Sequence, residues 1–353
     1  MAFDSRIHSA YLEEGPEAGE VTAAELEALD FDGAEPSPIM LFFQRLGRRI
    51  MFLFKLSIFL ALVGAYPVSV VLSNRIDDSD ITLSDGQNWS YPAAGVAITK
   101  IARELEGKGW AADKPNWHPQ ARLTAMPAWQ EATADGLAEF TRMIAARNGI
   151  DGQPDDDLEA ASRLLNGLPG EDMRPRLTAA AEALNRFDNR VRRDLVNLPD
   201  ARETLTQELR MFAGWSEADQ DDLSTQINQE PTGWPASKQD IRVFYAAKAR
   251  SHIALQMLLA ARAADPAMAQ DPSLRAAMDK AEAAWSRAAR IRPLVVSNQK
   301  GDGALMSNHL AALGFFLRDA QTASLELADL LEAPAAPATE DVAQLEPGTG
   351  AVQ

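Results

Sequence analysis

Four polar side chains near the C-terminal end of the chain have the residue types and spacing of a small binding site. Asn298 and Asp302 belong to a glycine-containing loop, and Asn308 and His309 follow it at the start of a predicted helix. A helix N-terminus behind such a loop can hold an anion, and a neutral histidine can exchange a proton near pH 7. We take these four residues as the candidate ligand-binding site. The alternative is a connecting turn, in which Asp302 or Ser307 caps the helix and His309 bonds to the backbone.

The composition excludes the chemistry that depends on cysteine and disfavours a histidine-rich metal site. The chain of 353 residues has no cysteine and only four histidines. This excludes disulfides, thiolate zinc sites and cysteine nucleophiles, and it disfavours a multi-histidine metal site. The loop 297–303 lacks the Gly-Lys-Ser/Thr sequence of a phosphate-binding loop. We therefore predict no catalytic residue, no metal and no cofactor. Whether the protein is an enzyme stays open, with a noncatalytic role favoured.

Two other groups of polar residues have simpler interpretations. The acidic run 151–157 would need glycine at its sixth position and glutamate at its twelfth to form an EF-hand, but Asp156 and Ser162 stand there. We expect a solvated loop in which Asp155 or Asp156 caps the next helix. His252 lies in an apolar helical stripe, so we expect a buried, hydrogen-bonded residue.

Helices must position these residues, because apolar side chains recur at three- and four-residue steps through the long central part of the chain. The longest predicted helix, Ser237–Ala264, places Tyr245, Lys248 and His252 on one side. The other predicted helices are Pro92–Lys108, Pro127–Arg147, Asp157–Leu168, Arg176–Leu198, Asp200–Ala213, Glu217–Ile227, Pro272–Arg290 and Met306–Leu331. Only Leu294–Val296 has a strand-like composition. The predicted fold class is all-α, one transmembrane helix followed by a helical bundle.

Residues 50–72 form the most apolar stretch, with Lys55 as its only charge. A membrane-spanning helix needs about 20 apolar residues, so the stretch predicts one transmembrane helix. Arg45, Arg48 and Arg49 precede it and acidic residues follow it. Because basic flanks stay in the cytoplasm, we expect a bacterial inner-membrane protein with its N-terminus inside and the rest in the periplasm. The alternatives are a buried helix of a soluble core and a cleaved signal peptide, but 44 residues with ten acidic side chains come first.

The chain is expected to have four parts. Residues 1–38 are acidic and predict a disordered cytoplasmic tail, in which Val21–Leu29 fits either a docking helix for a cytoplasmic partner or a transient helix. Residues 39–74 contain an interfacial segment and the span, and residues 75–332 form the periplasmic α-helical domain. Residues 333–353 are an Ala/Pro-rich, disordered tail.

The charge balance bears on partners. With 34 basic and 51 acidic residues, the net charge is −17, which disfavours binding to the phosphate backbone of nucleic acid. From the predicted span and its orientation, the expected partners are the lipid bilayer of the inner membrane and a protein of the cell envelope.

Three stretches of the C-terminal third carry a family resemblance: Phe244–Arg250, Pro293–Asn298 and Asn308–Leu310. With the turn Met126–Gln130, they resemble the DUF2333 family, a group of uncharacterised bacterial membrane-anchored proteins. The resemblance covers about residues 50–332 and contains no catalytic signature. It implies an anchor followed by a helical domain, and it supplies no mechanism.

Two functions from different classes fit this sequence. The first, which we favour, is a noncatalytic envelope scaffold or partner-binding protein tethered to the inner membrane. The second is a ligand-binding or enzymatic periplasmic domain with a polar site around residues 298–309. A deep pocket lined by the four candidate residues would favour the second function, and a filled bundle would favour the first.

Overall fold

The protein is described by a computed structural model. The described residues are 37–73, 76–81, 89–107, 109–115, 117–149, 152–167, 171–229, 236–293, 295–299 and 307–333. Within these ranges all regular structure of the chain is helical and no strand occurs, which confirms the all-α prediction. The predicted tails lie outside the described residues except for Ser37, Pro38 and Ala333. The chain divides into two compact units, Met1–Ala65 and Tyr66–Gln353.

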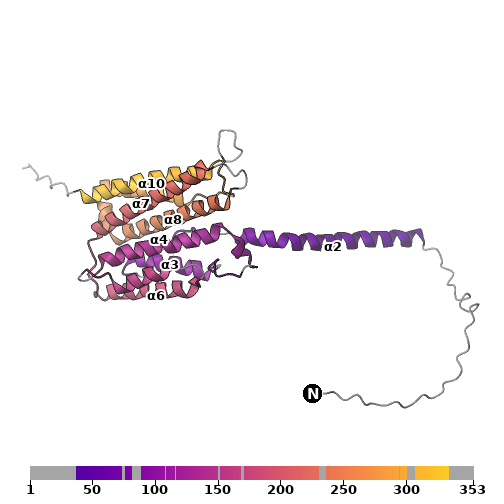
Figure 1. The fold of residues 1–353 in the computed structure, drawn as a ribbon, viewed down its shortest axis with the longest axis horizontal. Helices are drawn as coiled ribbons and strands as arrows, with labels where there is room; N and C mark the ends of the chain where they lie inside the picture. The colour runs from indigo at the N-terminus through magenta and orange to yellow at the C-terminus, as the bar shows by residue number, and fades with distance from the viewer. Residues whose placement is uncertain are drawn as a thin grey trace, which may run out of the picture. The chain divides into compact units, whose positions relative to one another are not determined.

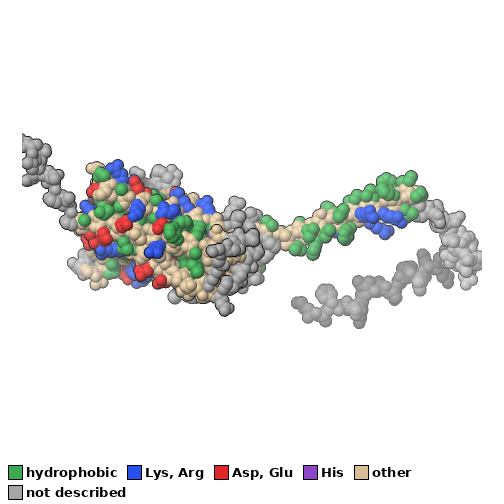
Figure 2. Space-filling view, turned by 90° about the horizontal axis from the view of Figure 1, so that it is seen from above, with side chains coloured by type: hydrophobic (Ala, Val, Ile, Leu, Met, Phe, Trp, Pro, Cys, Tyr) green, Lys and Arg blue, Asp and Glu red, His purple; other side chains and the backbone are tan. Residues whose placement is uncertain are grey.

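The helix α2, Pro38–Ser73, contains the whole predicted span and the segment before it. The predicted interfacial segment is therefore not a separate element but the first turns of α2. Large apolar side chains are exposed along the helix from Ile39 to Val68, and Figure 2 shows them as green patches along most of its length. None of the helices described combines the length and apolarity that a membrane crossing requires, so the structure does not support the predicted span 50–72. The side chains at 66, 67 and 70–72 lie outside the described residues.

The second unit contains a bundle of eight α-helices within its described residues. These are α3 (Pro92–Glu106), α4 (Ala125–Arg147), α5 (Asp156–Leu165), α6 (Met173–Arg192), α7 (Ala201–Asn228), α8 (Lys238–Ala264), α9 (Pro272–Ala289) and α10 (His309–Glu332), with 3-10 turns at Pro119–Arg122 and Pro266–Gln270. α10 packs on α7 and α9, while α3, α4, α5 and α6 form the other half. Figure 1 shows α8 between these halves, where it contacts α3, α4, α7 and α9.

Capping side chains explain where several helices begin. Asp155, one of the two residues that the sequence offered as the cap, accepts hydrogen bonds from two backbone N–H groups at the start of α5. Ser237 and Asp240 form a reciprocal capping box at the start of α8. Asn308 caps α10, which begins at His309. These caps satisfy N–H groups that a helix leaves unbonded in its first turn.

One long helix replaces two predicted ones, Asp200–Ala213 and Glu217–Ile227, because α7 runs unbroken from Ala201 to Asn228. The fully buried Ser216 donates a hydrogen bond to the carbonyl of Leu317 in α10 at 2.6 Å. Close packing against α10 therefore keeps α7 helical through Gly214, a residue that weakens helices in isolation.

The predicted helix Arg176–Leu198 ends early, because α6 stops at Arg192. Asp194 has a φ of 55°, in the left-handed region that commonly terminates helices. The N–H of Leu195 then bonds to the carbonyl of Arg190 at 3.0 Å. Leu198 thereby falls in the connection to α7, where it lines a cavity described below.

Candidate functional site

Residues 76–81, which we call the strap, lie against α3 and α8 and are held by side chains of both helices. Lys100 and Arg103 of α3 donate hydrogen bonds to strap carbonyls at 3.2 and 3.0 Å. Gln256 of α8 accepts one from the N–H of Ile81 at 2.7 Å. Because these bonds are made to the strap's backbone, they fix the position of the strap along the two helices.

The most deeply buried charge of the strap is Asp78, which is 6% exposed. Its carboxylate accepts hydrogen bonds from Nζ of Lys248 at 2.7 Å and from Nε of Arg292 at 2.9 Å. Burial alone would raise the pKa of Asp78, but the bonds from Arg292 and Lys248 lower it to about 2. Burial lowers the pKa of Lys248, an effect that Asp78 opposes. Asp78 therefore joins the strap to α8 through Lys248 and to the segment after α9 through Arg292.

Trp129 of α4 forms an aromatic platform beside this pair. Its ring centroid lies 4.6 Å from Nζ of Lys100 and 5.7 Å from Nζ of Lys248, within the range of a cation–π contact. Its indole N–H donates to Glu104 at 2.9 Å, and Lys100 pairs with Glu104 at 3.0 Å. The two buried lysines are thus neutralised by one carboxylate each and share one aromatic ring.

His252 completes the buried polar cluster under the strap. Its ring is 1% exposed and its Nε2 lies 3.2 Å from the carbonyl oxygen of Ser79, while Nδ1 is buried without a hydrogen-bond partner among the described residues. Burial and the charge of Lys100 lower its pKa to about 3. A histidine with this pKa is neutral near pH 7, so it donates to the strap rather than titrating. The predicted burial of His252 is confirmed.

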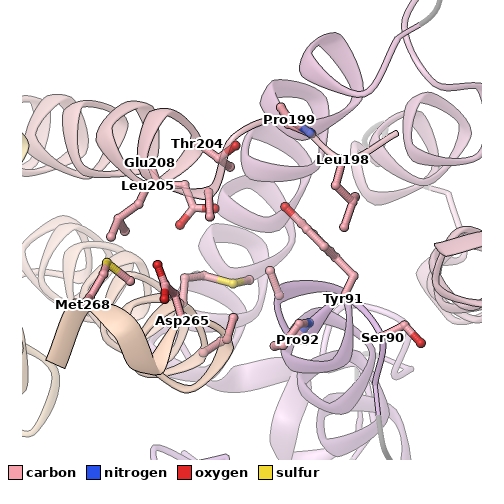
Figure 3. A pocket seen from close by; sticks show the side chains of 16 residues that line it. Ser90, Tyr91, Pro92, Leu198, Pro199, Thr204, Leu205, Glu208, Asp265 and Met268 are labelled. Atoms are coloured by element: carbon pink, nitrogen blue, oxygen red, sulfur yellow. The ribbon is translucent and has the colours of Figure 1, made fainter. Parts of the chain in front are cut away.

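A second region of the domain encloses a cavity of about 260 Å³ between the start of α3, the start of α7 and the end of α8 (Figure 3). Its walls are formed mainly by the apolar or small residues Pro92, Ala93, Leu198, Pro199, Ala201, Leu205, Met257, Ala260, Ala261, Ala264 and Met268. Its polar lining residues are Ser90, Tyr91, Thr204, Glu208 and Asp265. Leu198 is 43% exposed, so the cavity reaches the surface at that wall.

The carboxyl group of Glu208 is the unusual feature of this cavity. Figure 3 shows it and the Tyr91 hydroxyl directed into the same space. Glu208 is 5% exposed, and burial raises its pKa to about 8. Among the described residues, no hydrogen bond and no charged neighbour contributes to this shift, which burial alone causes. Burial and the charge of Glu208 also raise the pKa of Tyr91 well above its usual value.

The predicted site residues Asn298 and Asn308 lie together in the structure. Asn298 is buried and donates to the carbonyl of Gln226 at 3.0 Å and to Oδ1 of Asp240 at 3.1 Å. Asn308 donates to Oδ1 of Asn298 at 3.2 Å. These bonds join the loop to the C-terminal end of α7 and the N-terminal end of α8. Asp302 lies outside the described residues.

His309 closes the same loop from the first turn of α10. Its Nδ1 accepts a hydrogen bond from the N–H of Ser297 at 3.1 Å, and its own N–H donates to the carbonyl of Ser297 at 2.9 Å. Partial burial lowers its pKa. Because Nδ1 is an acceptor here, the ring is arranged to fasten the loop to α10 in its neutral form.

The acidic run 151–157 is used for helix contacts. Asp155 pairs with Arg190 of α6 at 2.6 Å, and Asp157 pairs with the same guanidinium at 3.0 Å. Within the described ranges, no cluster of three or more His, Asp or Glu side chains has the arrangement of a metal site. Asp151 lies outside those ranges.

Sequence reasoning overlooked the two most distinctive carboxyl groups. Asp78 entered only as part of the acidic flank of the predicted span, although Lys248 on an otherwise apolar stripe indicated a buried partner. Glu208 had a similar signal, because it stands next to Leu209 and three residues after Leu205, both buried. A charge at a buried helical position is the pattern that finds Glu208 and Lys248, the partner of Asp78.

No protein-family model, curated protein or solved structure matches this chain. The resemblance to the DUF2333 family therefore stays a prediction, and the functional argument depends on the molecule's own geometry.

Proposed function

We propose that this chain is a single-pass inner-membrane protein whose helical domain, residues 75–332, is a noncatalytic scaffold or partner-binding unit in the periplasm. The observation that carries the proposal is the exposure of α2. All five consecutive residues from Ile50 to Phe54 are more than half exposed, and five consecutive helical residues point around the whole circumference. Apolar surface in water is unfavourable by roughly 25 cal/mol per Å², so a helix of this kind needs an apolar medium.

Lipid is the medium that the charge pattern favours. Figure 2 shows basic side chains gathered on one stretch of α2, and Arg45, Arg48 and Arg49 occupy its N-terminal third. Such a flank interacts favourably with anionic headgroups and stays in the cytoplasm. The proposed span is residues 50–72, and it includes positions 66, 67 and 70–72, whose side chains lie outside the described residues.

The strap supports a tethering role. In the sequence only two residues separate Ser73, the end of α2, from Ile76, the start of the strap. A load on α2 would therefore reach the domain through the strap, at the bond from Lys100 to the Asp77 carbonyl and at the buried pair of Asp78 with Lys248. Because the charges under the strap bind one another, they favour a structural role over catalysis. The proposal includes membership of the DUF2333 family and a protein partner in the envelope.

Reporter fusions test the membrane arrangement. Alkaline phosphatase fused after Leu331 should be active, because this enzyme folds only in the oxidising periplasm, and the same reporter fused after Pro38 should be inactive. A fusion after Leu331 that is abundant and inactive would overturn the orientation. Separation of the full chain into the soluble fraction without detergent would overturn the membrane attachment itself.

Photo-crosslinking in living cells tests the partner. A photoreactive amino acid at Phe315, an α10 side chain that is 63% exposed, should give a discrete adduct with another envelope protein. Arg163 of α5, whose side chain is 72% exposed, is the matched control position on another helix. Equal, diffuse labelling from both positions, or none from either, would count against a partner on the α10 surface.

A further inference from the structure

The Glu208 cavity lies at a distance in the sequence from every residue of the predicted 298–309 site, and it has the features of a separate binding site. A cavity of roughly 150 Å³ can already hold benzene, and this one measures about 260 Å³. Apolar side chains make up most of its wall, so the body of a ligand would be apolar. The connection to the surface beside the exposed Leu198 offers a route of entry.

The polar end of the ligand follows from the charges in the wall. Among the described residues that line the cavity, Glu208, Asp265 and Tyr91 can carry negative charge, and none is Lys, Arg or His. An anionic ligand would meet an excess of acidic groups in the cavity wall. A cation would supply the partner that the buried Glu208 carboxyl lacks.

We propose that this cavity binds a small apolar molecule carrying one protonated amino group, with the Glu208 carboxylate as its counter-ion and the Tyr91 hydroxyl beside it. Tyr91 is held in place because its N–H donates to the buried Asp188 at 2.8 Å. The apolar body of the ligand would lie against Leu205, Met257 and Ala261. A primary amine with a chain of about six carbons satisfies both the apolar wall and the Glu208 carboxylate.

Binding must release a proton. The raised pKa of Glu208, about 8, keeps this group mostly protonated at pH 7, while an ordinary alkylammonium stays charged. Formation of the ion pair transfers the carboxyl proton to solvent, so affinity should rise about tenfold from pH 6 to pH 7. The other charged or titratable groups around the site are Tyr91, Asp265 at the end of α8, and Arg147 of α4, whose charge acts on Tyr91.

Calorimetric titration of the full chain in zwitterionic lipid nanodiscs tests the proposal, with empty nanodiscs as the blank. Hexylamine is the probe, and hexanol and hexanoate are the matched neutral and anionic compounds. Hexylamine should bind with one-to-one stoichiometry and at least tenfold more tightly than hexanol, and hexanoate should not bind. Repeating the titration at pH 7 in two buffers of different ionisation enthalpy should show release of nearly one proton per amine bound.

Three variants distinguish the carboxyl group from the cavity. Glu208→Gln should weaken hexylamine at least tenfold, abolish proton release and leave hexanol unchanged. Ala261→Leu fills the cavity while keeping the carboxyl group, so it should weaken both compounds. Glu217→Gln, an exposed position on the same helix, should leave both unchanged.

Several results would overturn the proposal. Equal binding of hexylamine and hexanol would mean that the cavity does not recognise the charge. Absence of binding by either compound would indicate a cavity filled by water alone. Hexylamine affinity that is retained in Glu208→Gln, with the variant folded as judged by its circular dichroism spectrum, would place the amine elsewhere.

Discussion

Two buried carboxyl groups of the same helical domain have pKa values displaced in opposite directions. Asp78 and Glu208 are 6% and 5% exposed, so both have lost nearly all contact with water. The pKa of Asp78 is lowered to about 2, because hydrogen bonds from Arg292 and Lys248 outweigh its burial. The pKa of Glu208 is raised to about 8 by burial alone. At similar exposure, the presence or absence of hydrogen-bonded cations therefore decides the direction of the pKa shift.

The difference separates a structural region from a region able to bind. Asp78 is bonded within the fold, where removing it would leave Lys248 buried without its counter-charge. Glu208 has no such partner and faces a cavity. A carboxyl group of the second kind lowers stability whenever it ionises, and a cation from outside the domain would remove that penalty.

The largest expected effect is the pH dependence that Glu208 imposes on folding. Its pKa is about 8 in the folded chain against an ordinary 4.5, so the folded state binds the extra proton between these values. Stability should fall as pH rises through this window, by about 4–5 kcal/mol in total. Urea unfolding of the full chain from pH 4.5 to 8.5 should show that Glu208→Gln loses this slope. Glu217→Gln is the control, and an unchanged slope in Glu208→Gln would refute the assignment.

Loss of the Asp78 charge should have the next largest effect. Asp78→Asn leaves Lys248 buried without a counter-ion, which should lower the free energy of unfolding by about 3 kcal/mol at pH 7. Asp77→Asn, one residue away and exposed, is the matched control and should have a small effect. Adding Lys248→Met to Asp78→Asn should recover part of the loss. If both single asparagine variants unfolded alike, the buried pair would not be the main contact of the strap.

At acid pH, Asp78 should make the free energy of unfolding rise with pH, whereas Glu208 makes it fall. The pKa of Asp78 is about 2 in the folded chain against 3.8 ordinarily, so its contribution is complete above pH 3.8 and disappears as pH falls toward 2. The contribution amounts to about 2 kcal/mol. Unfolding midpoints measured from pH 5 to pH 2 should converge for the wild type and Asp78→Asn. A constant gap between them across that range would argue against the lowered pKa.

The smallest effect should come from the outer ion pair of the strap. Arg290 and Asp80 pair at 2.6 Å, but their side chains are 52% and 49% exposed. Water and salt screen such pairs, so Arg290→Ala should change the free energy of unfolding by about 0.5 kcal/mol or less. A loss as large as that of Asp78→Asn would show that the strap depends on its outer charges. The effect of Arg290→Ala should be smaller at high salt than at low salt, because salt screens exposed charges.

Much of the fold followed from local patterns in the sequence. Apolar spacing predicted the positions of α3, α4, α8 and α9 to within a few residues, and the Asp155 cap of α5 was correct. The two errors have different causes. α7 continues through Gly214 because α10, which is distant in the sequence, packs against it. α6 stops at Arg192 because of a local feature, the left-handed backbone at Asp194.

The candidate site was less predictable than the fold. The sequence drew attention to Asn298, Asn308 and His309, which lie together and bond to one another or to nearby backbone. It gave no comparable emphasis to Glu208, since a single acidic residue on a helix is usually solvated. The cavity exists because the start of α3, the start of α7 and the end of α8 meet around it, and no local pattern encodes that meeting.

The helical class, most helix positions, the absence of cysteine chemistry and the apolar character of α2 follow from the sequence alone. These properties depend on residues a few positions apart, whose spacing is visible in one dimension. Which charges are buried and which have partners depends on long-range packing, because Asp78 meets Lys248 across 170 residues. A pKa depends on the dielectric and the charges within a few ångströms. For that reason two ordinary acidic residues of this chain became, after folding, a structural ion pair and an unpaired carboxyl group facing a cavity.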